Sequence, residues 1–409
     1  MSKLEELIEQ LCPDGVEYRT TKDIRIDSFW LMPATPNFIS EGVPYITSKN
    51  IKDGIIDFND VKYISIDDYQ AISNNRKIEV NDLLVTMIGT IGEAAFVQSE
   101  MDFYGQNLYL IRLNTEVVNR KFFYYFLTSP AVKNRLVSKK NTSSQGYIKA
   151  GNLENLTIPL PPLPVQEEIV RILDNMTKLT AELTAELKGR QKQYEYYRDS
   201  LLNFEGNTKG NVEFIALSEL FNTKNGYTPS KSKEEYWTNG TIPWFRMEDI
   251  RANGRILTDS LQHVSQSAVK GNLFPKNSII IATSATIGEH ALVKVDFLAN
   301  QRFTVLMLKK QYKKMFDEKF LYYYCFKLDR YCLSCLNQSS FASVDMVKFA
   351  NFKFPIVPLE EQQRIVDILD LFDKLCNDIS EGLPAEIEAR KKQYEYYRDK
   401  LLTFKEKEA

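Results

Sequence analysis

The sequence predicts an α+β protein with two globular α/β domains, separated by two long antiparallel spacer helices and related by a pseudo-twofold axis. The main observation is a repeat: Gln-Tyr-Glu-Tyr-Tyr-Arg-Asp at residues 193–199 returns at residues 393–399. Its period of 393 − 193 = 200 residues is the size of a duplicated domain with its connector. Each copy also ends a long stretch with apolar residues at helical spacing. A chain with two related halves favours a nearly twofold partner, and double-stranded DNA is the commonest.

The duplication extends through most of the chain. The sequence Ile-Gly-Glu at residues 91–93 returns at residues 287–289, with a period of 287 − 91 = 196 residues. The second connector is therefore longer by 200 − 196 = 4 residues, which fall around residues 382–385. Outside the matched blocks the halves share little, as two readers of different half-sites would require.

Each globular part is predicted to contain strands followed by a helix. Residues with β-branched and aromatic side chains predict strands at 43–46, 82–87, 108–113, 242–245, 278–282 and 303–308. Helices are expected at 122–137 and about 320–336. The aromatic run at residues 122–126 could stack on bases, but its helical spacing favours a place in the core.

A proline cluster at residues 159–164 ends the first globular part, because proline cannot continue a helix or a central strand. One apolar stripe then predicts a helix over residues 165–204, roughly 60 Å long. Gly382 and Pro384 predict a break in the second spacer. Antiparallel packing of the two spacers would bury both stripes. The predicted segments are globular domain 1, spacer 1, globular domain 2 and spacer 2, at residues 1–160, 161–206, 207–356 and 357–409.

The first spacer contains a tandem repeat, Thr-Ala-Glu-Leu at residues 180–183 and again at 184–187. One such unit changes a helix by roughly 6 Å, which is on the order of one to two base pairs along a duplex. Chance repetition in a helix rich in Ala, Glu and Leu is the alternative. Its place between two expected readers favours a spacing function.

Composition limits the compartment and the kind of site. No apolar run reaches membrane-spanning length and no signal-peptide core is found, so a soluble, cytoplasmic protein is expected. The five cysteines are odd in number and lack paired spacing, which argues against a disulfide framework. Cys332 and Cys335 are more typical of buried thiols than of half a zinc site.

The net charge of −2 hides a strongly basic segment. Residues 117–153 contain no Asp or Glu and seven cations, which are Arg120, Lys121, Lys133, Arg135, Lys139, Lys140 and Lys149. A solvated helix face is the alternative explanation. In a nearly neutral protein, a stretch of this length favours contact with phosphates.

Four sets of residues carry a family resemblance. They are residues 162–174 (PLPVQEEIVRILD), the Thr-Ala-Glu-Leu tandem, both Gln-Tyr-Glu-Tyr-Tyr-Arg-Asp blocks and residues 382–387 (GLPAEI). Together they resemble the specificity subunit of type I restriction–modification systems, over nearly the whole chain.

The resemblance implies two target-recognition domains, each of which reads one half of a split DNA site. The spacers would set the gap between the halves and dock two methyltransferase subunits, which carry S-adenosylmethionine and methylate adenine. Two motor-nuclease subunits would complete a restriction enzyme. The chain has no Asn/Asp-Pro-Pro-aromatic motif, no Gly-rich cofactor loop after a strand and no Walker A lysine. A non-catalytic subunit that binds no cofactor or metal itself is therefore expected.

Base-reading residues are sought among polar residues in loops that recur in both halves. In the first domain they are Ser48, Lys49, Asn50, Thr86, Thr90, Gln106, Asn107, Lys139, Lys140, Asn141, Ser143, Ser144, Gln145 and Lys149. In the second they are Arg246, Glu248, Asp249, Thr283, Ser284, Thr286, Gln301, Arg302, Gln338, Ser339, Ser340 and Ser343. The loop at 139–149 is the strongest candidate, because its lysines can anchor phosphates while its amides address an adenine edge. Glu248 or Asp249 could accept from cytosine N4, or could be turn or cap residues.

Partner docking is predicted at Tyr194, Tyr197, Tyr394 and Tyr397 on the spacers. An exposed apolar surface on the spacers would distinguish a subunit that docks catalytic partners from the alternative, a bipartite DNA-binding regulator. The regulator needs only an internal helix pair. A third hypothesis is an enzyme that acts alone, and the missing motifs count against it. Because the two domains differ in sequence, an asymmetric site is expected.

Overall fold

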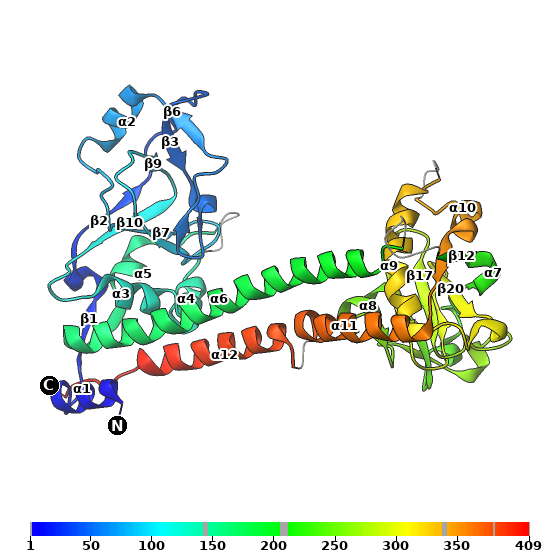
Figure 1. Ribbon diagram of the computed structural model, residues 1–409. Coiled ribbons are helices and arrows are strands. Elements are labelled where there is room, and N and C mark those ends of the chain that lie inside the picture. The colour runs from blue at the N-terminus through cyan, green and yellow to red at the C-terminus, as the bar shows by residue number, and fades with distance from the viewer. Residues whose placement is uncertain (1, 142–145, 205–211, 338–341, 379–380, 409) are drawn as a thin grey trace. The chain divides into compact units, whose positions relative to one another are not determined.

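The protein folds into two compact units, which are described separately. The computed structural model describes residues 2–141, 146–204, 212–337, 342–378 and 381–408. Unit 1 comprises Met1–Glu182 with Glu388–Ala409, and unit 2 comprises Leu183–Ile387. Each unit joins a globular part to spacer segments from two distant regions of the chain (Figure 1). The boundaries of the four segments expected from the sequence, at residues 1–160, 161–206, 207–356 and 357–409, stay a prediction.

The globular part of unit 1 is built on two sheets. An antiparallel sheet has the order β2 (Arg25–Leu31), β10 (Leu108–Leu113), β7 (Leu83–Thr86), β8 (Ala94–Phe96). A smaller sheet has the order β6 (Lys62–Ile64), β3 (Val43–Ile46), β9 (Tyr104–Gly105), and its β3–β9 pair is parallel. Two further antiparallel pairs are β1 (Glu17–Thr20) with β11 (Thr157–Leu160), and β4 (Ile51–Lys52) with β5 (Ile55–Ile56). The helices are α1 (Lys3–Leu11), η1 (Thr21–Ile24), η2 (Ser48–Asn50), α2 (Ile66–Ser73), α3 (Arg120–Leu127), α4 (Pro130–Ser138) and α5 (Ala150–Glu154).

Unit 2 repeats this arrangement. Its main sheet has the order β13 (Phe221–Asn225), β20 (Phe303–Leu308), β17 (Ser278–Ala282), β18 (His290–Val293), β15 (Ile256–Leu257). The smaller sheet has the order β16 (His263–Val264), β14 (Ile242–Phe245), β19 (Leu298–Ala299), again with one parallel pair, β14–β19. β12 (Glu213–Ala216) pairs with β21 (Lys353–Ile356). The globular helices are α7 (Leu217–Leu220), η3 (Glu234–Tyr236), α8 (Met247–Asn253), η4 (Gln266–Ala268), η5 (Lys310–Tyr312), α9 (Glu318–Ser334) and α10 (Met346–Asn351).

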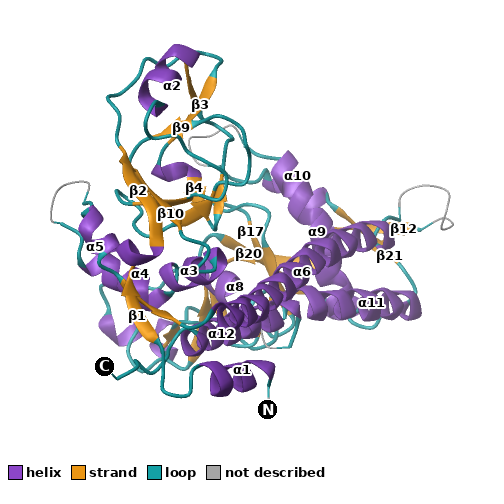
Figure 2. Cartoon of the chain, turned by 90° about the vertical axis from the view of Figure 1, so that its left-hand side faces the viewer, coloured by secondary structure: helices purple, strands orange, loops and turns teal. Residues whose placement is uncertain are grey.

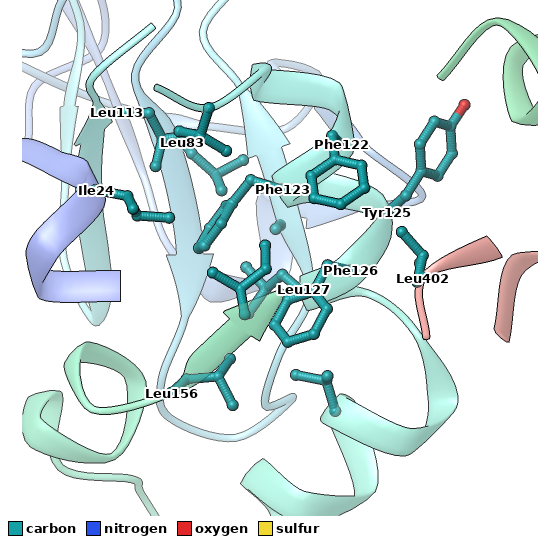
Figure 3. Packing of buried hydrophobic residues seen from close by; sticks show 14 of the residues in the cluster. Ile24, Leu83, Leu113, Phe122, Phe123, Tyr125, Phe126, Leu127, Leu156 and Leu402 are labelled. Carbon is teal, nitrogen blue, oxygen red and sulfur yellow. The ribbon is translucent and has the colours of Figure 1, made fainter. Parts of the chain in front are cut away.

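The main sheet of unit 1 separates two hydrophobic clusters, because alternate residues of a strand face opposite sides. Along β7, Leu83 and Val85 join the cluster that contains Phe122, whereas Leu84 joins the cluster that contains Tyr45. Figure 2 shows β2 and β10 of this sheet, and Figure 3 shows Leu83 and Phe122 in the first cluster. This burial on both faces explains why β7 is apolar at every position except its last.

Residues 122–137 form two helices, so the predicted single helix is wrong. Ser129 accepts a hydrogen bond from the backbone N–H of Val132 at 3.4 Å, and Pro130 occupies the first position of α4. Both features favour a new helix start over continuation. Phe122, Phe123 and Phe126 are buried, so the core explanation of the aromatic run is confirmed. The five cysteines are free and buried, as expected for core thiols.

The first spacer is one uninterrupted helix, α6 (Leu163–Leu201), as predicted. The second is broken into α11 (Leu359–Asn377) and α12 (Leu383–Leu401), also as predicted. Gly382 is required at the break, because a Cβ there would lie 2.6 Å from the carbonyl oxygens of Lys374 and Asp378. Within unit 1, α6 and α12 run antiparallel (Figure 1).

Candidate nucleic-acid interface

In unit 1 the candidate loops meet at one end of the main sheet. The parallel pairing of β3 with β9 places Tyr45 opposite Tyr104, and the N–H of Gln106 donates to the carbonyl of Ile46 at 3.1 Å. This bond places residues 48–50 beside residues 106–107. The parallel pairing is therefore what brings together two loops more than fifty residues apart in the sequence.

Two further links in unit 1 extend this cluster. Leu108 pairs with Thr86 across β10 and β7, so residues 106–107 lie beside the loop that follows β7. The N–H of Ile148 then donates to the carbonyl of Met87 at 3.0 Å, which joins that loop to the basic segment 139–149. In the described residues, the four candidate regions of unit 1 are thus joined by a chain of backbone links.

Unit 2 has the same three links at the equivalent positions. The N–H of Asn300 donates to the carbonyl of Phe245 at 3.0 Å, and Phe303 pairs with Ala282 across β20 and β17. The N–H of Val344 donates to the carbonyl of Thr283 at 3.0 Å. The sequence duplication is therefore a duplication of one loop scaffold that carries different side chains.

Asn50 and Asp249 are cap residues, and the full burial of Asp249 corrects its assignment as a base reader. Asn50 accepts from the N–H of Thr47 at 2.9 Å and donates to the carbonyl of Asp57 at 3.0 Å. Asp249 is fully buried, and its two oxygens accept from the N–H groups of Arg246 and Leu261, each at 2.6 Å. The turn or cap alternative therefore holds for Asp249. Asn50 is partly exposed, and its side-chain oxygen also caps a turn.

Thr86 and Thr283 also hold the scaffold rather than offering a surface. Thr86 is fully buried, and its hydroxyl accepts from the N–H of Glu93 at 3.0 Å. Thr283 is buried, and its hydroxyl lies 2.9 Å from that of Thr304. Glu93 belongs to the Ile-Gly-Glu block, in which Gly92 has φ +80°. This block therefore serves a tight turn.

Asn107 and Asn141 stabilise the loops on which they lie. Asn107 takes the left-handed backbone conformation, with φ +66°, immediately before β10. The side-chain oxygen of Asn141 accepts from the N–H of Tyr147 at 2.8 Å. This bond closes the base of the 139–149 loop.

The remaining candidates are accessible or lie outside the described residues. The exposed ones are Lys49, Thr90, Lys139, Lys140, Lys149, Glu248, Gln301 and Arg302. Ser48, Gln106, Arg246, Ser284, Thr286 and Ser343 are partly exposed. Ser143, Ser144, Gln145, Gln338, Ser339 and Ser340 lie outside the described residues. Of the seven cations in the basic segment, Lys121 pairs with Asp174 and Lys133 with Glu93, so these two do not serve phosphates alone.

An open pocket of about 840 Å³ in unit 2 brings four candidates together. Arg246, Glu248, Gln301 and Arg302 all line it. Trp237 and Trp244, which were not among the sequence candidates, line the same pocket with ring centroids 5.0 Å apart. Trp244 could have been found from the sequence repeat, because it aligns with Tyr45 after the shared proline. Trp237 could not, because only the fold brings it beside Trp244.

The docking tyrosines differ in accessibility. Tyr194 is 5% exposed and its ring lies 6.3 Å from that of Phe372, so it is a core residue of unit 2. This corrects its assignment as a docking residue. Tyr394 is half-buried and packs beside Tyr125 in unit 1, at 6.5 Å. Tyr197 and Tyr397 are exposed, as are their neighbours Tyr196 and Tyr396.

One buried glutamine anchors each globular part to the start of the spacer that follows it. Gln166 of α6 is fully buried, accepts from the N–H of Asn119 at 2.8 Å and donates to the carbonyl of Pro161 at 2.7 Å. Gln362 of α11 makes the equivalent bonds to Asp317 and Val357, at 2.8 and 2.6 Å. Eight residues further along each spacer, Asp174 and Asp370 accept from Tyr125 and Tyr323, which fixes a second point two turns away.

The described parts of the chain contain no helix that is long and apolar enough to cross a membrane. Within the same ranges no three His, Cys, Asp or Glu side chains are grouped so that they could hold a metal ion.

The comparisons with known proteins agree on one family. The family model described as the type I restriction modification DNA specificity domain matches residues 30–190 and 209–389. Over 205 residues the chain is 58% identical to the EcoprrI type I restriction enzyme specificity subunit of Escherichia coli, a match that spans 48% of this chain and about half (51%) of that protein. Over 301 residues it is 41% identical to the EcoR124I/EcoR124II specificity subunit of the same species, which covers 69% and 70% of the two chains.

A solved structure supports the fold. The chain resembles, with a TM-score of 0.65 and 18% identity, a protein solved in work on complex assembly and conformational transition of the type I R-M system. The match covers 95% of this chain and 98% of that one. The chain belongs to the type I restriction modification DNA specificity domain family.

Proposed function

We propose that this protein is the DNA-recognition (specificity) subunit of a type I restriction–modification complex. It reads a split, asymmetric DNA site, with one unit for each half. The observation that carries the proposal is the loop cluster found in both units, built on the same three backbone links. Equal scaffolds with different side chains suit two readers of different sequences.

Each cluster combines the two kinds of contact that sequence-specific binding needs. Exposed cations such as Lys139, Lys140 and Lys149 in unit 1 supply phosphate contacts, which fix position on the duplex. Polar side chains between them, such as Gln106 in unit 1 and Gln301 in unit 2, can address base edges.

The chemistry belongs to partner subunits in this proposal. The sequence lacks the methyltransferase motif and the Gly-rich cofactor loop, and the relatives carry the name specificity subunit. Two methyltransferase subunits, which hold S-adenosylmethionine, would dock on the spacers, and two motor-nuclease subunits would complete a restriction enzyme. The exposed tyrosines Tyr196, Tyr197, Tyr396 and Tyr397 offer apolar surface for docking. Such a surface and the family membership both disfavour a regulator without a catalytic partner.

The test is co-expression with a methyltransferase subunit of a type I system, followed by long-read mapping of N6-methyladenine. A split motif with a fixed gap and two different halves is expected. The same host without this protein is the control, because the motif should vanish there. Methylation of a continuous site, or an unchanged methylation pattern without the protein, would contradict the proposal.

A further inference from the structure

We propose that Arg246 and Glu248 read one G·C base pair in the major groove, within the half-site of unit 2. This inference rests on the proposed function and adds the identity of a base pair and of its two readers. A G·C pair presents a fixed order of groups in the major groove, which is the N7 and O6 acceptors of guanine followed by the N4 amino donor of cytosine. A guanidinium beside a carboxylate presents the complementary order.

The backbone of Arg246 is held rigidly at the end of β14. Its N–H donates to Asp249 at 2.6 Å, and the preceding residue Phe245 accepts from Asn300 of the parallel neighbour at 3.0 Å. The second oxygen of Asp249 is held by Leu261. The backbone from which the side chain of Arg246 extends is therefore fixed, as specific recognition requires.

The ring of Trp244 orients the guanidinium of Arg246. Its central carbon lies 5.5 Å from the centroid of the Trp244 ring. Trp244 is itself fixed, because its indole N–H donates to the carbonyl of Tyr227 at 3.0 Å and Trp237 packs against it edge-on. Stacking uses the face of a guanidinium and leaves the donors on its edge free for a bidentate contact.

Glu248 is close to Arg246 without saturating it. The carboxylate oxygen lies 3.9 Å from Arg246 Nε, which is too long for a hydrogen bond. Arg246 Nε is buried and has no hydrogen-bond partner among the described residues. The side chain of Glu248 is 60% exposed, so its second oxygen can accept from outside the protein. The pair is therefore placed together with hydrogen-bonding capacity to spare.

A phosphate is a poor alternative ligand for this pair. Glu248 would repel it, whereas the amino group of cytosine is a donor that a carboxylate accepts. Exposed cations elsewhere on the pocket, Lys231 and Arg302, are better placed for phosphates. The first unit has Thr47 and Lys49 at the positions of Arg246 and Glu248, so this reader is specific to unit 2.

The test measures binding of the complex with its methyltransferase subunit to duplexes that carry the mapped motif. Guanines are replaced one at a time by 7-deazaguanine, which keeps base pairing but lacks the N7 acceptor. We expect one position at which this replacement weakens wild-type binding about 10-fold, and at which Arg246→Gln shows no further loss. Glu248→Gln should lose discrimination at the same base pair, and it tests the proposal independently if Arg246→Gln does not fold.

Lys49→Ala is the matched control in unit 1, and it should retain the full effect of 7-deazaguanine at that position. The inference fails if no guanine responds in the wild type, or if Arg246→Gln remains as sensitive as the wild type. It also fails if Arg246→Gln weakens all sequences equally, because that is the behaviour of a phosphate contact. Loss of all sequence preference in the wild-type complex would instead overturn the proposed function on which the inference depends.

Discussion

Tyr125 in α3 donates a hydrogen bond of 2.6 Å to Asp174 in the spacer helix α6. The same bond recurs in unit 2, where Tyr323 donates to Asp370 at 2.7 Å. Burial and the neighbouring carboxylate raise the pKa of both tyrosines, so both remain donors throughout the physiological range. Each globular part is therefore tied to the spacer that follows it by the same charged hydrogen bond.

Tyr125→Phe should destabilise unit 1 by about 1–2 kcal/mol, because a hydrogen bond to a charged group is lost while Lys121 still pairs with Asp174. Hydrogen exchange that resolves α3 from the helices of unit 2 would measure the effect. Tyr323→Phe is the matched variant and should weaken unit 2 alone. Equal loosening of both units by either variant would contradict a local anchor.

Glu168 should make the attachment of α1 sensitive to acid. It is 3% exposed, and hydrogen bonds from Arg171 and then Lys3 hold its pKa at about 2, against an ordinary value of 4.5. A lowered folded-state pKa adds stability that is complete above the ordinary value and is lost as the pH falls towards 2. The contribution is on the order of 1–2 kcal/mol, because Lys3 and Arg171 are largely exposed and screened.

Glu168→Gln should remove that dependence. The free energies of unfolding of the wild type and the variant, measured between pH 6 and pH 2.5, should converge as the pH falls. Glu361 is the matched control in unit 2, because it pairs with Arg364 in the same way but is more exposed. A constant difference between wild type and Glu168→Gln at all pH values would contradict the assignment.

Ala285 is strained and Gly89, at the equivalent loop position of unit 1, is not. Ala285 has φ +64°, where a side chain costs roughly 1–2 kcal/mol, whereas glycine takes φ +76° at position 89 freely. Ala285→Gly should stabilise unit 2 by about 0.5–1 kcal/mol once the added chain entropy is subtracted. Gly89→Ala should destabilise unit 1 by about 1 kcal/mol, since no atom crowds the new Cβ. Chemical denaturation, monitored in each unit by hydrogen exchange, would measure the change in the free energy of unfolding. The two variants should change it in opposite directions, and a change in the same direction would contradict the strain at Ala285.

Exposed spacer tyrosines should matter for assembly and not for folding. Replacement of Tyr396 and Tyr397 by serine should weaken binding of the methyltransferase subunit about 10-fold or more, because exposed aromatic rings often dominate interfaces. Calorimetry of assembly would measure the loss. Tyr147→Ser is a control of similar exposure in the candidate DNA loop and should leave assembly unchanged. Equal loss with Tyr147→Ser would remove the docking role from the spacer pair.

The regular elements could be predicted because local pattern determines them. Residues 43–46, 108–113 and 303–308 are strands with the predicted bounds, since each contains β-branched and aromatic side chains. The break at Ser129 was missed because an amphipathic pattern continues across it. Ser129 as a cap and Pro130 at the first position are local signals for a new helix, and in the folded chain they outweigh that pattern.

The candidate site was predicted as a set of loops but not as individual readers. Asn50 and Asp249 are residue types that can read bases, yet each side chain caps a turn that only the folded chain creates. Trp237 reaches Trp244 through a loop whose course no periodicity reveals. The pairing of β3 with β9 joins residues too far apart in sequence for local rules to anticipate.

In the proposed function, the length of α6 sets the gap between the two halves of the DNA site. The tandem at residues 180–187 lies in uninterrupted helix, and the boundary between the units falls inside it, after Glu182. Most of its side chains are exposed, but Leu187 packs against the core of unit 2. When residues 184–187 are deleted, Leu183 takes the place of Leu187 in the sequence, so the same side chain is available to that core.

The direct measurement is therefore N6-methyladenine mapping after deletion of residues 184–187, in cells that contain the methyltransferase subunit. The account predicts that both halves of the motif persist while the gap shortens by about one to two base pairs. An unchanged gap, or a change in the bases of either half, would contradict it.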